Sequence, residues 1–111
     1  MKSFFYNHDI AAETVGKGIT RKVLAHNKEL MVCEIEFKKG SIGVLHKHFH
    51  SQCSYIVSGV FEFEIDGVKK ILKAGDSTYK QPDVMHGCVC LETGKLIDIF
   101  TPMREDFIND K

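Results

Sequence analysis

The sequence predicts a single all-β domain whose strands form a closed barrel or two stacked sheets. Residues 30–37 and 60–67 alternate apolar and charged side chains, which is the pattern of half-buried strands. Other short strand-like stretches follow at close spacing with Gly or Asn between them, and about ten such strands favour a closed or double-sheet fold. At 111 residues the chain can bury one core, so residues 1–111 are expected to be one domain.

The remaining elements have local signals in chain order. Helices are expected only at residues 10–14 and at residues 104–110 near the C-terminus. Asp66-Gly67 is a strong two-residue hairpin signal, and it should join residues 61–65 to an antiparallel strand at residues 68–73. Further strands are expected at residues 16–26, 44–48, 53–59, 77–81, 86–92 and 94–102.

Three histidines and a glutamine form a candidate site for one divalent metal. His46 and His48 lie two residues apart in an expected strand, so their side chains should share a face. Gln52 returns to the same region where the next strand begins, and His86 follows a turn that contains Pro82. Because the spacing and the turn residues agree in two separate segments, we predict that these four side chains converge on one ion.

Ligand softness favours a divalent transition metal such as zinc, nickel, iron, cobalt or copper over magnesium or calcium, with manganese as a further candidate. Because all four ligands are neutral, the ion would keep its full double positive charge and act as a stronger Lewis acid. His50 lies two residues beyond His48, but a bend expected in this stretch should turn it away from the ion. His8 and His26 are expected to be surface residues or hydrogen-bonded core residues.

Composition excludes several classes of partner. Fifteen basic and fifteen acidic residues cancel without a long run of either sign, so neither nucleic acid nor a membrane surface is an expected partner. The chain shows no signal-peptide pattern and no long apolar run, so we expect a cytoplasmic protein. The four cysteines should then be free thiols. Cys88 and Cys90 are expected in the core, with a place beside the site as the alternative.

The two segments that carry the candidate ligands resemble the two motifs of the cupin superfamily. The first motif covers residues 40–59, and the second covers residues 75–86. This resemblance implies a jelly-roll β-barrel with a concave pocket around the metal. The sequence departs from the usual pattern because Gln52 stands where most cupins have glutamate. Gln81 and Asp83 also stand where cupins often have proline and glycine.

A closer resemblance covers nearly the whole chain. Residues 18–67, 72–87 and 94–107 look like the KdgF family, small cupins of pectin and alginate breakdown. The ending at residues 98–107, DIFTPMREDF, is the most specific part, because a cupin barrel does not require it. The resemblance implies an enzyme that converts 4,5-unsaturated monouronates, the products of pectin or alginate lyases, to linear 4-deoxy-5-keto uronates.

The same resemblance assigns roles to residues near the C-terminus. Asp98 corresponds to the family's essential aspartate and would be the acid-base group, whereas strand parity alone leaves an exposed carboxylate equally open. Arg104 matches the substrate-binding arginine and would hold the uronate carboxylate, the alternative being a surface pair with Glu105 or Asp106. Phe100 could pack against the sugar or belong to the core, and Arg21 is a further candidate for the anionic substrate.

Two other functions remain open on the sequence. One is a metal-dependent cupin dioxygenase, since three histidines with open coordination positions could hold iron and bind oxygen. The other is a module that binds a sugar or a metal without chemistry. Neither alternative explains the DIFTPMREDF ending. Because small jelly rolls have exposed sheet edges, a homodimer is expected.

Overall fold

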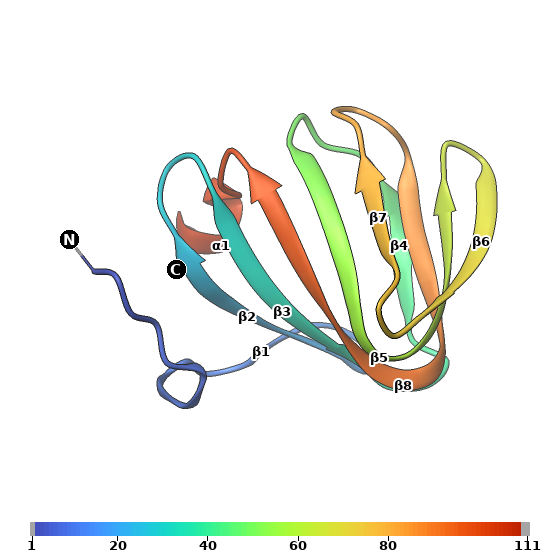
Figure 1. Ribbon diagram of the computed structural model, residues 1–111, viewed down its shortest axis with the longest axis horizontal. Helices are drawn as coiled ribbons and strands as arrows, with labels where there is room; N and C mark the ends of the chain where they lie inside the picture. The colour runs from blue at the N-terminus through green and yellow to red at the C-terminus, as the bar shows by residue number, and fades with distance from the viewer. Residues whose placement is uncertain (1, 110–111) are drawn as a thin grey trace.

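The computed structural model of the protein describes residues 2–109, which form an antiparallel β structure with a short C-terminal helix (Figure 1). The elements are η1 (Asn7–Asp9), β1 (Glu13–Gly16), β2 (Ile19–His26), β3 (Met31–Phe37), β4 (Ile42–His46), β5 (Ser51–Ile65), β6 (Val68–Lys73), β7 (Ser77–Lys80), β8 (His86–Thr101) and α1 (Glu105–Asn109). Within residues 2–109, no helix has the length and apolarity needed to cross a membrane.

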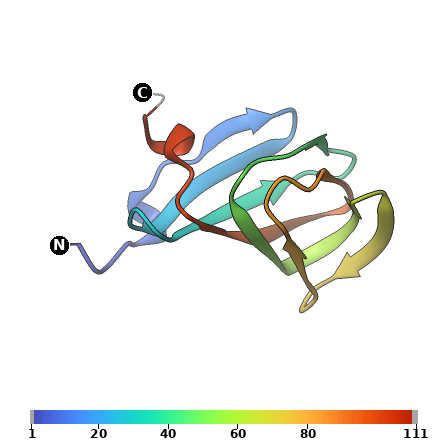
Figure 2. The same ribbon diagram turned by 90° about the horizontal axis from the view of Figure 1, so that it is seen from above.

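The strands form two layers, and the two long strands β5 and β8 contribute one half to each layer. The first half of β5 and the second half of β8 lie in one layer, whose strand order is β1-β2-β3-β8-β5-β7. The other halves of the two strands lie in the second layer, whose order is β4-β8-β5-β6. Figure 1 shows both long strands curving between the layers, and Figure 2 shows the layers from above. The all-β jelly-roll barrel expected from the sequence is confirmed.

The expected number of about ten strands is wrong, because two expected strand breaks are bends. Residues 53–59 and 60–67 contribute to one strand, β5, and residues 86–92 and 94–102 contribute to another, β8. Gly59 and Gly94 lie against each other where these strands curve, and a Cβ on Gly59 would lie 2.6 Å from the Glu92 carbonyl oxygen. Glycine therefore permits a close backbone crossing here, where the sequence suggested turns.

The expected helix at residues 10–14 is also wrong. A single 3-10 turn, η1, ends before this stretch, and β1 pairs with β2, so that Glu13 lies opposite Arg21. The hairpin prediction is confirmed, because Asp66 and Gly67 both have positive φ angles between β5 and β6. The helix expected at residues 104–110 is confirmed by α1, although Asp110 lies outside the described residues.

The core lies between the two layers, and one inner face carries polar residues beside the apolar ones. Phe37 and Phe61 pack edge to face with 5.1 Å between ring centroids. The apolar core residues are Ile19, Met31, Cys33, Ile35, Phe37, Ile56, Phe61, Phe63, Cys90, Leu96 and Phe100. Cys88 packs against this core, as expected, and all four cysteines are free thiols.

Candidate metal centre and cavity

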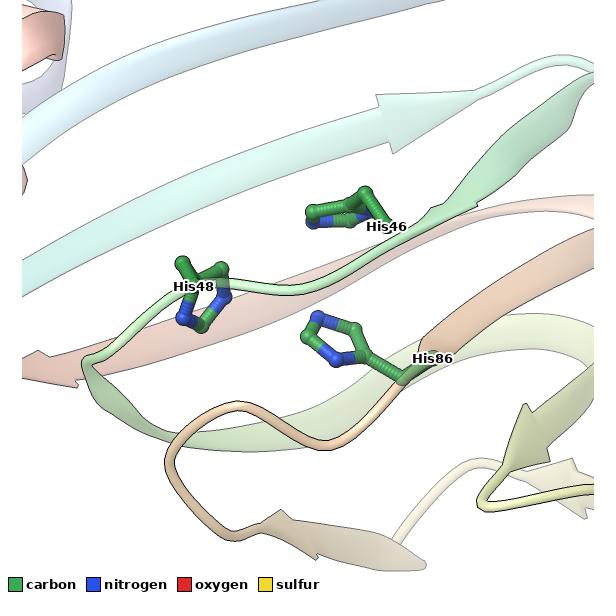
Figure 3. Close-up of side chains that lie close together, drawn as sticks. All are labelled: His46, His48 and His86. Carbon is green, nitrogen blue, oxygen red and sulfur yellow. The ribbon is translucent and has the colours of Figure 1, made fainter.

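Three histidine rings gather between the end of β4 and the start of β8 (Figure 3). His46 and His86 lie opposite each other in the β4–β8 pairing, with ring centroids 4.5 Å apart. His48 lies in the loop after β4, so the expected strand at residues 44–48 ends two residues early. Its ring centroid is nevertheless 4.9 Å from that of His86, and one nitrogen from each ring lies within 4.8 Å of the others.

Backbone carbonyl groups fix which nitrogen of each ring faces the centre of the group. Nδ1 of His46 lies 2.8 Å from the Val44 carbonyl oxygen, and Nδ1 of His86 lies 3.0 Å from that of Val84. Nδ1 of His48 lies 3.2 Å from the carbonyl oxygen of His50. A carbonyl only accepts hydrogen bonds, so each Nδ1 is the protonated nitrogen and each Nε2 keeps its lone pair. This is the arrangement that metal-binding histidines adopt.

Gln52 faces the same point from β5, as expected. Its side-chain oxygen lies 2.9 Å from Nε2 of His48, and the residue is buried. Since Nδ1 of His48 already donates to a carbonyl, both of these converging atoms are acceptors in the neutral residues. Two ligands bound at about 2.1 Å to one ion, at a right angle, would lie about 3 Å apart. A shared cation therefore fits this pair.

Burial keeps two of the rings neutral. It lowers the pKa of His48 below that of an ordinary imidazole, and it lowers the pKa of His86 to about 4. Nε2 of His86 is buried, and within residues 2–109 it has no hydrogen-bond partner. A buried nitrogen lone pair without a partner is costly unless something binds it, and a metal ion would do so. The donor set therefore fits a transition metal.

The low pKa of His86 predicts that the metal-free protein loses stability in acid. Between about pH 4 and pH 6.5 the unfolded chain binds a proton that the folded His86 does not bind. The free energy of unfolding therefore rises with pH in this window, and the contribution of His86 is fully present only above it.

We expect the melting temperature of the chelator-treated protein to fall as the pH is lowered through this window. His86→Asn, which cannot titrate, should show a shallower dependence when both are followed by circular dichroism. A melting temperature that stays flat from pH 6.5 to pH 4 would contradict the burial argument for His86.

A cavity of about 1100 Å³ opens beside the histidine group. His46 and Gln52 line it together with Asp98 and Phe100 of β8. Asp98 and Phe100 point inward while Ile99 between them is exposed, so the alternation expected for this strand is correct. The Asp98 carboxylate accepts a hydrogen bond of 2.5 Å at Oδ1 from the hydroxyl of Ser54. Phe100 is only 2% exposed, so it is both a core residue and part of the cavity wall.

Two arginines line the same cavity, and both contact one aromatic ring. The guanidinium carbon of Arg21 lies 3.5 Å from the ring centroid of Phe107, and that of Arg104 lies 4.3 Å from it. Arg21 pairs with Glu13 at 3.0 Å, and Arg104 forms two hydrogen bonds to Asp106. Burial alone would raise the pKa of Asp106, but the hydrogen bond and the charge of Arg104 outweigh it and lower that pKa.

The surface pair that the sequence left as an alternative for Arg104 is present, and the substrate-binding role of Arg104 stays a prediction. It pairs with a neighbouring carboxylate, and its side chain, 14% exposed, also lines the cavity. Asp106 is largely exposed, so an incoming carboxylate can compete for the guanidinium from the cavity side. Phe107, which contacts both arginines, was not singled out from the sequence, although it belongs to the distinctive C-terminal ending.

His50 lies outside the three-histidine group although it is buried. Its ring stacks on Phe49 with 4.0 Å between centroids and contacts Phe100 edge to face. His8 is exposed and His26 bonds to the carbonyl of Leu24, as expected for histidines away from a site. Sequence reasoning missed Lys80 and Ser54, two buried polar residues behind Asp98. In the short strand β7 it is Lys80, and not the neighbouring Tyr79, whose side chain points inward, and the sequence alone does not indicate this.

Comparisons with known proteins agree with this architecture. The cupin domain model matches residues 33–100. The pectin degradation protein KdgF of Dickeya dadantii (strain 3937) is 43% identical over 97% of this chain and all of its own length. The structure of KdgF from Halomonas sp. is 40% identical with a TM-score of 0.92, covering 96% of this chain and 99% of that one. An RmlC-like cupin from Shewanella frigidimarina NCIMB 400 is 47% identical with a TM-score of 0.93, covering 96% of both chains. On these matches the chain belongs to the cupin superfamily and, within it, to the KdgF family.

Proposed function

We propose that this protein is a pectin-degradation enzyme that opens the ring of 4,5-unsaturated monouronates. Its product would be the linear 4-deoxy-5-keto uronate, and its substrate would come from pectin or alginate lyases. The observation that carries the proposal is a cavity lined by Asp98, Arg104 and His46 together, beside the rest of the histidine group. The identity to a protein named for pectin degradation supports it independently.

The reaction asks for three functions that this cavity can provide. The substrate is a cyclic enol ether that carries a carboxylate on C5. A proton adds to C4 and water adds to C5. The resulting hemiketal opens by cleavage of its ring C5–O bond to give the C5 ketone, and the C1 hydrate that this leaves loses one water to become the aldehyde. The net change is therefore an isomerisation. These steps need a group that moves protons, an anchor for the carboxylate and a source of positive charge.

Asp98 is the proposed proton-transfer group. Its Oδ1 accepts the hydrogen bond of Ser54, which leaves Oδ2 to deliver a proton to C4 of the sugar. The water that adds to C5 then returns a proton to the same carboxylate, so the residue is restored after each turnover. Phe100 forms the wall beside Asp98 and would support a sugar face.

The neutral ligands would hold a divalent transition metal through His46, His48, His86 and Gln52. When bound, this ion would supply Lewis acidity that polarises oxygen atoms and lowers the pKa of coordinated water.

Arg104 is the proposed anchor for the uronate carboxylate, with Arg21 as a second, weaker contributor. Arg104→Lys keeps the charge but removes the two-pronged hydrogen bond, so we expect KM to rise by about 10-fold with a smaller change in kcat. Steady-state kinetics on the unsaturated uronate measures both. Arg21→Lys should have a smaller effect because Glu13 already holds that guanidinium. An unchanged KM in Arg104→Lys would remove the residue from the binding site.

An ultraviolet assay tests the proposed activity directly. The conjugated C4=C5 bond absorbs, so purified protein should accelerate the loss of absorbance of unsaturated galacturonate, and a chelator should abolish the acceleration. If no uronate is consumed faster than in buffer, the proposal is wrong. Oxygen uptake would then test the dioxygenase, and ligand binding without turnover would test the binding module.

The expected homodimer and cytoplasmic location stay predictions. Light scattering of the purified protein measures the mass of the assembly and decides the first. The chemistry proposed above uses residues of one chain and does not depend on the outcome.

A further inference from the structure

A lysine is buried directly behind the cavity wall. Lys80 of β7 is 1% exposed, although lysine is among the residues least often buried in proteins. Its ammonium nitrogen lies 2.6 Å from the hydroxyl oxygen of Ser54 and 2.6 Å from that of Thr78. It also lies over the Phe63 ring, 4.8 Å from the centroid. Two hydroxyl groups and an aromatic face therefore surround the charge.

A chain of hydrogen bonds leads from Lys80 through Ser54 to Asp98, and each member donates to the next. An ammonium group has no lone pair, so Lys80 must donate to Ser54. The hydroxyl proton of Ser54 is then free to point at Oδ1 of Asp98, at 2.5 Å. Thr78, Ser54 and Asp98 lie opposite one another on β7, β5 and β8, so the pairing of three neighbouring strands holds this chain of hydrogen bonds.

Stability alone gives a weak reason for a lysine at this position. Burial lowers the pKa of Lys80, and the negative charge of Asp98 partly opposes that shift. Replacing a buried charged pair by apolar side chains of similar volume is often neutral or stabilising. A methionine could fill the same space without taking a charge out of water. A costly buried charge linked to a cavity carboxylate therefore points to a role in function.

We infer that Lys80 is a positioning residue that acts through Ser54 to fix the orientation of the Asp98 carboxylate in the cavity wall. This inference rests on the proposed role of Asp98 in ring opening. Neither Lys80 nor Ser54 lines the cavity, so neither would touch the substrate. Their contribution is the geometry of the one carboxylate that does.

Two variants each break one part of the hydrogen-bond chain from Lys80 to Asp98. Lys80→Met removes the ammonium while keeping the length of the side chain, and Ser54→Ala removes the bridging hydroxyl. In each we expect kcat to fall by about 10- to 100-fold with KM changed by less than about 3-fold, and with unchanged metal content. The double variant should be no slower than the slower single variant, because both act on the same carboxylate.

The melting temperature and a matched control separate positioning from simple support of the fold. Removing Lys80 alone leaves Asp98 without its charged partner, so Lys80→Met is expected to melt below the wild type. Its kcat is therefore compared at a temperature well below both melting points, where a fall in kcat cannot come from unfolded protein. Thr78→Val removes the other hydroxyl partner of Lys80 but leaves the link to Asp98, so its kcat should stay near wild type. Should Lys80→Met fail to fold, Ser54→Ala carries the same test with the lysine in place.

Kinetics and a crystal structure test the inference independently of each other. If the wild type opens the uronate ring and both variants match its kcat, the inference is wrong while the proposed function stands. If the wild type has no such activity, the proposed function is wrong. The crystal structure of Lys80→Met then tests whether Lys80 orients the Asp98 carboxylate. A changed orientation of Asp98 or Ser54 supports the inference, whereas an unchanged Asp98 side chain, still bonded to Ser54, overturns it.

Discussion

Asp98→Asn is expected to lower kcat by roughly 10²- to 10⁴-fold, the range that a general acid-base group contributes. Asparagine has the shape of aspartate and its oxygen can still accept the hydrogen bond from Ser54, so the cavity wall should keep its form. It cannot deliver a proton to C4, so the chemical step should fail. Steady-state kinetics on unsaturated galacturonate measures the loss.

The variant has a control with the same chemical change. Asp66→Asn alters a carboxylate in the exposed β5–β6 hairpin, at a position where asparagine tolerates the positive φ angle. Its activity should equal that of the wild type. Asp98→Asn should also bind the metal stoichiometrically. Normal turnover by Asp98→Asn would show that another group moves the proton.

His48→Ala is expected to remove the metal and the activity together. The substitution deletes one of three imidazoles and leaves Gln52 without its partner at 2.9 Å. Removing even a group that only supports a metal ligand typically costs 10- to 100-fold in affinity, and loss of a ligand itself should cost at least about as much. Elemental analysis of the purified variant measures the metal, and the ultraviolet assay measures the activity.

Stability gives a second measure of the same loss. An ion that binds only the folded state raises the melting temperature, so a chelator should lower that of the wild type but not that of His48→Ala. His26→Ala, a histidine away from the cavity, should behave as the wild type in both assays. An inactive His48→Ala protein that retains a full equivalent of metal would show that His48 is not needed to bind the metal.

The strands that sequence reasoning placed correctly have a clear solvent side. Residues 30–37 alternate between buried and more exposed positions, and the Asp-Gly dipeptide after β5 has the backbone that its hairpin requires. The convergence of His46, His48 and His86 was predictable because their spacing and the turn before His86 are local features. Local patterns of this kind need no knowledge of the partner strand.

The features that were missed depend on which strands meet. In the four residues of β7, alternation allows either Tyr79 or Lys80 to face the core, and hydrophobicity favours the tyrosine. The structure has the reverse, with Tyr79 58% exposed and Lys80 buried. Register with β5 decides this, because Lys80 must face Ser54 and Asp98. The continuation of β5 through Gly59 was hidden for a similar reason, since the close crossing partner lies on another strand.

The bend in β8 makes one strand responsible for both halves of the proposed chemistry. His86 is the first residue of β8 and Asp98 lies near its other end, so the proposed ion ligand and the proposed proton-transfer group are parts of one continuous strand. The separation between them is then set by how sharply this strand turns at Gly94, rather than by the packing of a flexible loop. Changes at that crossing would alter the reach of the acid toward the ion without replacing any residue that contacts either one. The curvature of one strand would thus set the distance between the two proposed functional groups.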